Sequence, residues 1–300
     1  MPTPTSTGAF SSVLAPGLRK IYTEDLKDRI TEYDKIAHIV TSKRNYEDDL
    51  EVALLGTTPK KIQGGPTTFD NPIQGSSVRY THVSYGLGFR VTREMQDDDL
   101  YDVMKKASKD LSAANAETVE TTFWSIFNNA TDATVFAGFD GLALASTAHT
   151  LLGGGTYANR PTTDVQLSVT ALQAAVESFE KMVNGRNRKI LAKPWRVIIP
   201  VEQKWIAREI LGSAYKPYSS NNEINSLIDE ELSFFVCHYA TDTNNWALIG
   251  RNHDWKFFWR KRPVFENGDD FGTGDAMFKT FFRCVAGFGS WRETYFTAPA

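Results

Sequence analysis

The feature that most constrains this chain is an unbroken helical pattern from Asp97 to about Ala130. No glycine or proline interrupts it, and none follows until Gly138. Apolar residues recur at intervals of three and four, which is the spacing of one buried helix face. We expect this face to contain Leu100, Met104, Leu111, Phe123, Ile126 and Phe127. At about 1.5 Å per residue, the helix would be roughly 50 Å long. Because globular helices average about 11–12 residues, we expect a strut rather than a core filler.

Charged residues mark the start of this helix. Asp97, Asp98 and Asp99 provide an N-cap candidate and place negative charge at the positive end of the helix dipole. The same triplet could hold a divalent cation, but a cap explains it better because a helix start needs one. Asp102 is placed to pair with Lys106 one turn later.

Composition places the chain among ordinary globular proteins. It has 300 residues, of which 41% are hydrophobic and 23% charged, and its formal net charge is -3. This charge argues against nonspecific binding to nucleic acid. No run of about 18 apolar residues predicts a membrane span, and residues 1–7 lack the features of a secretory signal. With only Cys237 and Cys284, we expect buried thiols in a reducing cytoplasm rather than a disulfide framework.

Three segments precede the long helix. Residues 1–17 are rich in Pro, Thr, Ser and Gly, so we expect them to be disordered or to lie on a neighbouring chain. A helical pattern follows over Leu18–Val40 and includes Ile30 on its buried face. Residues 56–77 are full of glycine and proline. A loop of this length is usually functional or disordered.

Alternating apolar residues lead from that loop to the long helix. Val83–Val91 alternates as a half-buried strand does. Val78, Tyr80 and His82 alternate in the opposite phase, so we expect a bend or a bulge after His82. Together these segments predict a two-stranded ribbon that ends just before the helix. An isolated ribbon is marginal in water, so it should rest on a partner.

The second half mixes helices and strands, so the predicted fold class is α+β. An amphipathic helix has Ser168 or Thr170 as its cap and Gly185 as its C-terminal glycine. Pro200 suits the first turn of another helix, which reaches Leu211. Strands are predicted at 195–199, 232–239, 246–250, 255–259, 277–286 and 291–296.

A search for catalytic, cofactor and metal motifs finds none. The five histidines lack the spacing of a zinc site. Gly86-Leu87-Gly88 and Gly153-Gly154-Gly155 lack the other residues of nucleotide- and phosphate-binding loops. Cys237 and His238 would point to opposite faces of a strand. We therefore expect no enzyme, although an enzyme using that pair is an alternative that alanine substitution would test.

Two short basic clusters leave open a second alternative, a nucleic-acid-binding protein. They are Arg186, Arg188 and Lys189, and Arg260, Lys261 and Arg262. Such side chains bind phosphate. Given the net charge, a solvated edge or pairing with acids at a subunit contact explains them better. The many aromatic residues of the last third are better explained as core than as a base-stacking platform.

The arm, long loop, ribbon, helix and α+β body together resemble the major capsid protein of tailed bacteriophages, which has the fold named after phage Hong Kong ninety-seven. Within this family, the sequence most resembles the Mu-type major head subunit. The resemblance spans about Leu18–Phe296 and rests on Ile36–Ser42, Leu87–Asp99 and Asp140–His149. Ala148 departs from the acidic residue that this group usually has there.

The resemblance implies a division of the chain. It would comprise an N-terminal arm and first helix (1–45), an extended loop or β-ribbon (46–92), the spine helix with part of a peripheral domain (93–194), an axial domain (195–250), and return strands (251–300). The implied function is structural: a major capsid subunit forming hexamers and pentamers in an icosahedral shell around double-stranded DNA. A related alternative is the encapsulin-like shell of a cellular nanocompartment.

The resemblance also implies contacts and partners. The arm and ribbon would lie over adjacent subunits, and the loop 213–222 would point to the capsomer centre. Candidate inter-subunit contacts are Lys60, Lys61, Phe69, Arg79, Tyr80, Tyr215 and Tyr218. Expected partners are scaffold, portal and cement proteins, with the genomic DNA enclosed without sequence-specific binding, no membrane and no cofactor. The location would be the virion capsid, assembled in the host cytoplasm.

Two properties of some family members are not expected here. A lysine–asparagine cross-link between subunits would need a partner for Lys60 or Lys61, and the sequence identifies none. An N-terminal scaffolding domain would need a longer segment before the first helix. We therefore expect a separate scaffold protein.

Overall fold

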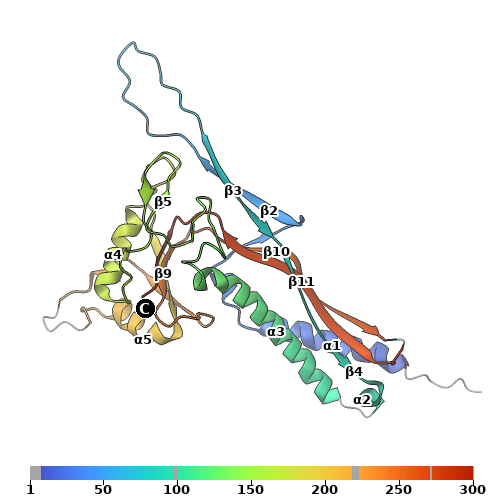
Figure 1. Ribbon diagram of the computed structural model, residues 1–300. Coiled ribbons are helices and arrows are strands. Elements are labelled where there is room, and N and C mark those ends of the chain that lie inside the picture. The colour runs from blue at the N-terminus through green and yellow to red at the C-terminus, as the bar shows by residue number, and fades with distance from the viewer. Residues whose placement is uncertain (1–7, 98–100, 218–222, 271, 300) are drawn as a thin grey trace, which may run out of the picture. The chain divides into compact units, whose positions relative to one another are not determined.

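The computed structural model describes residues 8–97, 101–217, 223–270 and 272–299 (Figure 1). The chain divides into two compact units, each assembled from separate stretches of sequence. The first unit takes Met1–Tyr46, Thr81–Phe123 and Phe257–Val285, and the second takes Glu47–Tyr80, Trp124–Lys256 and Ala286–Ala300. Helices and sheets are mixed along the chain, which confirms the α+β class.

The first unit is built on a four-stranded sheet. Its strand order is β1 (His38–Thr41), β10 (Trp255–Asp269), β11 (Ala276–Phe288) and β4 (Val83–Val91). β4 and β11 are antiparallel. Tyr85 stacks on Phe282 and Phe89 packs on Phe278, with ring centroids 5.1 and 5.2 Å apart. Such cross-strand aromatic pairs stabilise the register beyond simple burial.

Three helices accompany this sheet: α1 (Gly8–Asp28), α2 (Arg93–Asp97) and α3 (Tyr101–Asn128). A hydrophobic cluster packs α1 and the first half of α3 against the strands. Its buried members are Leu18, Tyr22, Val91, Met104, Leu111, Phe265, Ala276 and Phe278. The core of this unit therefore lies between the two long helices and the sheet.

The first helix differs from the prediction over Leu18–Val40. α1 begins at Gly8, so the expectation that all of residues 1–17 are disordered or lie on a neighbouring chain is wrong for residues 8–17. It ends at Asp28, a short 3₁₀ turn covers Tyr33–Lys35, and Ile30 is 86% exposed. The physical reason is Glu120, which lies in α3. Its carboxylate accepts hydrogen bonds from the backbone N–H of Glu32 (2.7 Å) and Tyr33 (3.0 Å), so the chain turns there instead of continuing as a helix.

Helix α3 is 28 residues long, or roughly 42 Å. The prediction that it begins at Asp97 is wrong, because Asp97 is the last residue of α2. Residues 98–100, including Leu100, lie outside the described part of the chain. Asp102 pairs with Lys105 at 3.5 Å rather than with Lys106.

The buried face of α3 combines apolar and polar side chains. Met104, Leu111, Phe123, Ile126 and Phe127 are buried. Between them, the Ser108 hydroxyl donates to the carbonyl of Leu18 (3.0 Å), and the Asn115 amide donates to Tyr22 (2.8 Å) and Thr280 (2.9 Å). Because these polar groups are hydrogen-bonded, they hold α1 and β11 against α3 without leaving an unpaired polar group buried.

A two-stranded ribbon precedes β4. It pairs β2 (Tyr46–Ala53) with β3 (Ile73–Thr81). The predicted change of phase after His82 is confirmed, since β3 ends at Thr81 and β4 begins at Val83. The expectation that Val83–Val91 belongs to the ribbon is wrong. That strand pairs with β11, where its aromatic residues find aromatic partners.

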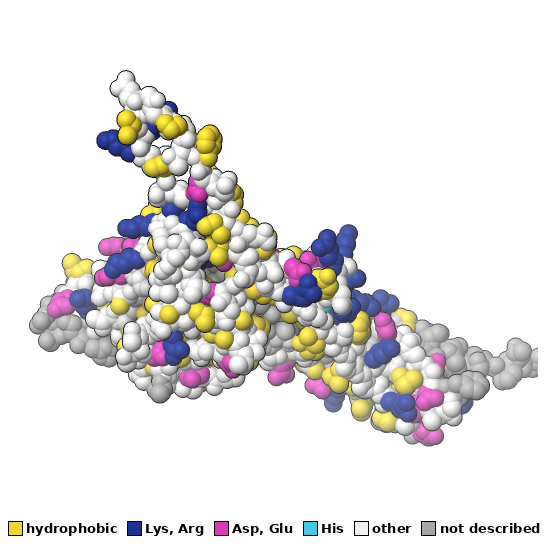
Figure 2. All heavy atoms as spheres, turned by 45° about the horizontal axis from the view of Figure 1, so that its top comes forward, with side chains coloured by type: hydrophobic (Ala, Val, Ile, Leu, Met, Phe, Trp, Pro, Cys, Tyr) yellow, Lys and Arg dark blue, Asp and Glu magenta, His cyan; other side chains and the backbone are white. Residues whose placement is uncertain are grey.

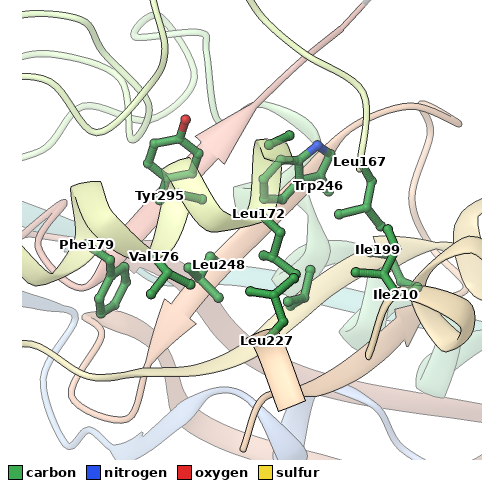
Figure 3. Close-up of a cluster of buried hydrophobic side chains, with 14 of the residues drawn as sticks. Leu167, Leu172, Val176, Phe179, Ile199, Ile210, Leu227, Trp246, Leu248 and Tyr295 are labelled. Carbon is green, nitrogen blue, oxygen red and sulfur yellow. The ribbon is translucent and has the colours of Figure 1, made fainter. Parts of the chain in front are cut away.

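The second unit contains a sheet of order β12 (Thr294–Thr297), β9 (Trp246–Gly250), β7 (Pro194–Pro200) and β8 (Ser233–Cys237). β7 and β8 are parallel, and the other neighbours are antiparallel. Helices α4 (Val169–Glu180) and α5 (Lys204–Gly212) share its core with the strands (Figure 3). Shorter elements are β5 (His149–Thr150), β6 (Thr156–Tyr157) and the 3₁₀ turns Val201–Gln203 and Ser226–Ile228.

Predicted helix ends in this unit are partly correct. The Ser168 hydroxyl accepts from the N–H of Ala171 at 3.2 Å, which confirms the cap of α4. Gly185 does not end that helix, because α4 already stops at Glu180. Pro200 closes β7 in an extended conformation, and a 3₁₀ turn separates it from α5.

Candidate intersubunit surfaces

The tip of the ribbon carries strongly exposed apolar side chains. It comprises the loop 54–72 between β2 and β3, and we call it the ribbon tip. Phe69 is 92% exposed and Ile62 79% exposed, and Leu54 and Leu55 are also exposed. Lys60 and Lys61 lie on the same loop and are exposed. Figure 2 shows hydrophobic and basic side chains together over this tip.

The root of this loop is tied to the turn after α4. Asp70 accepts hydrogen bonds from the backbone N–H of Gly56 (2.8 Å) and from the guanidinium of Arg186. Arg188 donates to the carbonyl of Leu55 at 3.2 Å. The hydrogen bond from Arg186, with that from Gly56, holds the pKa of Asp70 below its ordinary value. One of the two basic clusters therefore serves as an anchor within the chain.

The strands of the ribbon are held by ion pairs from both faces of β2. Asp48 forms a bidentate pair with Arg79 across the ribbon, at 2.7 and 2.8 Å. On the opposite face, Asp49 and Glu51 lie two residues apart and point the same way. Asp49 binds Lys256 (2.5 Å), and Glu51 binds Arg292 (3.0 Å).

Lys256 is the centre of a small charged cluster at the base of the ribbon. Its ammonium lies 2.5 Å from Asp49 and 2.7 Å from Asp254. Burial alone would lower the pKa of Lys256, but the hydrogen bonds to Asp254 and Asp49 raise it. The other oxygen of Asp254 accepts from the N–H groups of Gly289 and Ser290. The cluster therefore links β2, β10 and the segment before β12.

The structure places Tyr80 inside this base. Its side chain is 4% exposed, and burial, followed by the nearby charges of Asp49 and Asp254, raises the pKa of its hydroxyl. A Cβ atom at position 287 would lie 2.7 Å from the Tyr80 ring, so Gly287 is what allows this close packing. Tyr80 thus supports the ribbon from within its own subunit, whereas Arg79 on the same strand is exposed.

A second exposed segment follows α5. Tyr215 is 57% exposed and forms an isolated bridge with Ile224, and Lys216 pairs with Glu223 at 3.0 Å. Asn225 ties the base of the loop by donating to the carbonyls of Ile210 (2.6 Å) and Ser213 (2.9 Å). Residues 218–222, with Tyr218, lie outside the described part of the chain.

The other sequence motifs have structural roles. Cys237 and Cys284 are buried, as expected, and burial raises the pKa of Cys284 to about 12. His238 is exposed beside Cys237. Within the described ranges, no group of three His, Cys, Asp or Glu residues could hold a metal ion. None of the described helices is both long enough and apolar enough to cross a membrane.

The second basic cluster is also engaged within the chain. Lys261 lies 3.8 Å from Glu266 and over the ring of Phe281, and Arg262 lies over Trp259. Pairing with acids and aromatic rings accounts for Lys261 and Arg262 without a phosphate ligand.

Sequence reasoning missed the charged cluster of the ribbon base. The missing partners, Lys256 and Arg292, are more than 200 residues from β2 in sequence. One signal was present: Glu47, Asp49 and Glu51 alternate along a strand. Three acids on one strand face require cations or solvent opposite them.

Comparisons with known proteins agree with this architecture. A family model described as phage capsid protein matches residues 75–295. The capsid of a native GTA particle has a TM-score of 0.60 at 11% identity and covers 89% of this chain and 90% of its own. The capsid of cyanophage P-SCSP1u has a TM-score of 0.56 at 10% identity, over 91% of this chain and 89% of its own.

A virus-like particle from Pyrococcus furiosus is also similar, with a TM-score of 0.53 at 8% identity over 94% of this chain and 98% of its own. No protein of curated function matches. At such low identities the structural likenesses establish the fold, and the family match, which covers more than half of the sequence, establishes the family. The chain is therefore a member of the phage capsid protein family, with the architecture of a capsid shell subunit.

Proposed function

We propose that this chain is the major capsid subunit of a tailed phage, and that its copies form the hexamers and pentamers of an icosahedral shell around double-stranded DNA. The observation that carries the proposal is the contrast within the ribbon. Its base is held by partly buried ion pairs, whereas Phe69 and Ile62 at its tip are largely exposed. Exposed apolar side chains on a held scaffold are typical of an interface.

The ribbon tip, in this proposal, lies on an adjacent copy of the chain. Phe69 and Ile62 supply apolar area, and Lys60 and Lys61 supply charge around it. Arg79 would be a further contact nearer the base of the ribbon. Tyr215 and Tyr218 contribute to contacts around the capsomer axis. Each contact can be weak, because a closed lattice repeats it many times.

The domain assignment is part of the same proposal. Residues 93–194 would supply the spine helix and part of the peripheral domain, 195–250 the axial domain, and 251–300 the return strands. Residues 1–45 would form the arm and first helix. The extended loop expected at 46–92 would be limited to 46–81, because β4 pairs with β11. The likeness of the segments Leu87–Asp99 and Asp140–His149 to the Mu-type head subunit also belongs here.

Partners and location complete the proposal. A separate scaffold protein would direct assembly in the host cytoplasm, a portal would occupy one vertex, and cement proteins could decorate the surface. The chain would act without catalysis. The absence of catalysis in this proposal is supported by the structural roles of these residues. Cys237 and Cys284 are buried, and members of both basic clusters form ion pairs within the chain.

Electron microscopy of the purified protein tests the proposal directly. We expect closed shells when the protein is co-expressed with its scaffold, and irregular shells or open sheets when it is expressed alone. A protein that stays monomeric under both conditions would contradict the shell assignment. Uniform, correctly sized shells from this protein alone would leave the shell assignment standing and overturn only the proposal that a separate scaffold protein is needed.

A further inference from the structure

Two arginines of the second unit converge on one tryptophan ring. Trp195 and Arg196 are adjacent in β7, and Arg251 follows directly after β9. The pairing of these strands shifts register at Trp195, and such a bulge re-aims a side chain. The guanidinium carbon of Arg196 lies 4.2 Å from the centroid of the Trp195 ring, and that of Arg251 lies 5.7 Å from it. We call these three side chains the Trp195 cluster.

Aromatic rings of the sheet orient the cluster. The guanidinium of Arg196 also lies 5.9 Å from the ring of Phe235, which belongs to the neighbouring strand β8. Phe235 in turn stacks on the buried Trp124 of α3, with ring centroids 5.8 Å apart. A guanidinium near an aromatic face is attracted by the ring, and its planar shape fixes the directions of its N–H donors. The core of the unit therefore determines how Arg196 is presented.

The two arginines act on each other as like charges. Burial lowers the pKa of Arg196, and the charge of Arg251 lowers it further. Both effects disfavour the charged form, but a guanidinium stays protonated in proteins. The cluster therefore keeps two positive charges close together at a cost in free energy that a bound anion would offset.

Several other cations of the second unit are balanced by an acid of the same chain. Lys256 binds Asp49 and Asp254, Arg292 binds Glu51, and Arg160 binds Asp164. Arg251 differs from them. Its side chain is exposed, and in the described part of the chain it lies against the ring of Trp195 and forms no ion pair with a carboxylate. The charge of Arg251 is thus available to an anion from outside the subunit.

We propose that the Trp195 cluster is a binding site for the phosphate groups of nucleic acid, in which Arg196 and Arg251 contact the backbone of the DNA that the proposed shell encloses. A guanidinium presents a planar fork of N–H donors that matches phosphate oxygens. Trp195 positions these forks and does not stack on a base, because a guanidinium already lies over its ring. Backbone contacts carry no sequence information, so the site binds DNA of any sequence.

The exposed chemistry of the cluster suits a polyanion better than a second copy of the chain. Interfaces between proteins have an apolar centre, as we propose for the ribbon tip. In the Trp195 cluster the exposed side chain is the cation Arg251, whereas Trp195 and Arg196 are half-buried. Interfaces with DNA are more polar and much more positively charged than those between proteins. The observations therefore favour DNA as the partner.

The net charge of -3 restricts this binding to a local contact. Two arginines neutralise two phosphates, and each neutralised phosphate of duplex DNA contributes about -0.9 to the slope of log K against log salt concentration. The expected slope is therefore about -1.8. One such contact is weak, but every copy in a shell repeats it. The identity of the ligand as enclosed DNA rests on the proposed function, whereas the phosphate site itself is a property of the subunit.

Fluorescence anisotropy of a short labelled DNA duplex with the unassembled full-length subunit tests the site. When the salt concentration rises fivefold, from about 20 to about 100 mM, we expect the affinity to fall about 18-fold for the wild type and about fourfold for Arg251→Gln. Arg208→Gln removes the same charge from an exposed position of α5 and is the matched control, with the wild-type slope. Equal slopes in the two variants, or no binding by the wild type, would overturn the proposal.

A variant that keeps the charge tests the geometry. Arg196→Lys retains the positive charge but loses the planar fork, so we expect weaker binding at low salt with a slope close to that of the wild type. Thermal unfolding verifies that the variant is folded. Wild-type affinity in Arg196→Lys would contradict a site built on oriented guanidinium groups, and so would an affinity that differs between duplexes of unrelated sequence.

Electron microscopy of Arg251→Gln separates this inference from the proposed function. We expect the variant to form closed shells of wild-type size, because the cluster contacts DNA and not a neighbouring subunit. Loss of shells with unchanged DNA binding would identify the cluster as a contact with a second copy and overturn the inference. Failure of the wild-type protein to form shells would instead contradict the proposed function, and the anisotropy measurement would still decide whether the phosphate site exists.

Discussion

The base and the tip of the ribbon are adjacent in sequence but held by opposite means. At the base, Asp49 and Glu51 each bind a cation from the last 50 residues of the chain, and Tyr80 is buried beside them. At the tip, Phe69 and Ile62 are exposed. The difference teaches that the subunit fixes where its ribbon starts and leaves apolar side chains at its tip exposed, as the proposed contact with an adjacent copy requires.

Both regions depend on the chain being correctly folded, so the largest expected effect comes from α3. Leu111→Pro should abolish shells, because proline removes a hydrogen bond within the helix and clashes with the preceding turn, at a cost of about 3 kcal/mol or more. Electron microscopy of the variant is the measurement. Leu111→Met conserves volume and is the matched control. Normal particles from the proline variant would show that α3 is not the strut we describe.

The base can be broken by removing its central cation. Lys256→Met leaves Asp49 and Asp254 close together without their shared partner. Breaking a fully buried pair costs about 3–5 kcal/mol, so we expect a smaller but clear loss for these partly buried charges. Thermal unfolding of the subunit should show the loss, and Lys256→Arg should recover part of it. An unchanged melting temperature would mean that the ribbon base is held by packing around Tyr80 alone.

The tip should respond in the opposite way. Phe69→Ser and Ile62→Ser should leave the melting temperature of the free subunit nearly unchanged and weaken assembly. Complete burial of such side chains is worth about 1.5–3 kcal/mol each. The protein concentration at which shells form is the measurement. Ile30→Ser, at an exposed site outside the ribbon, is the matched control. A tip variant that assembles normally would show that these side chains are not at an interface.

The smallest effect is expected for the pair across the ribbon strands. Arg79→Ala removes an ion pair with Asp48 whose side chains are 59% and 41% exposed, and such pairs contribute below about 1 kcal/mol. Its effect on subunit stability should therefore be much smaller than that of Lys256→Met. If Arg79→Ala lowered the stability as much as Lys256→Met, the ion pairs on the two faces of β2 would contribute equally, which would contradict our interpretation.

Local pattern was sufficient for many elements. Ser168 was identifiable as the cap of α4, since a hydroxyl before an amphipathic run serves the free N–H groups there. The break after His82 was visible because the buried positions change parity there. Local pattern failed where a distant residue intervened. Ile30 fitted a helix face, but Glu120 in α3 binds the backbone next to it.

The candidate functional surfaces show the same division between what local sequence predicts and what distant residues decide. The long loop could be found from its glycines and prolines, and Phe69 was a candidate contact implied by the resemblance, but the exposure of Ile62 came from the structure. The anchors of the base could not, since Lys256 and Arg292 look like isolated surface charges until the strands bring them to β2.

The sequence by itself determined the helix α3, the α+β class, the long loop and, through its resemblance, the capsid family. Those properties follow from periodicity and residue type, which act over a few neighbouring positions. Tertiary structure alone decided that β4 pairs with β11, that Tyr80 is buried and that charges separated by 200 residues hold the ribbon. Such pairings depend on which surfaces meet in space, because a hydrogen bond or an ion pair requires contact and carries no local sequence period.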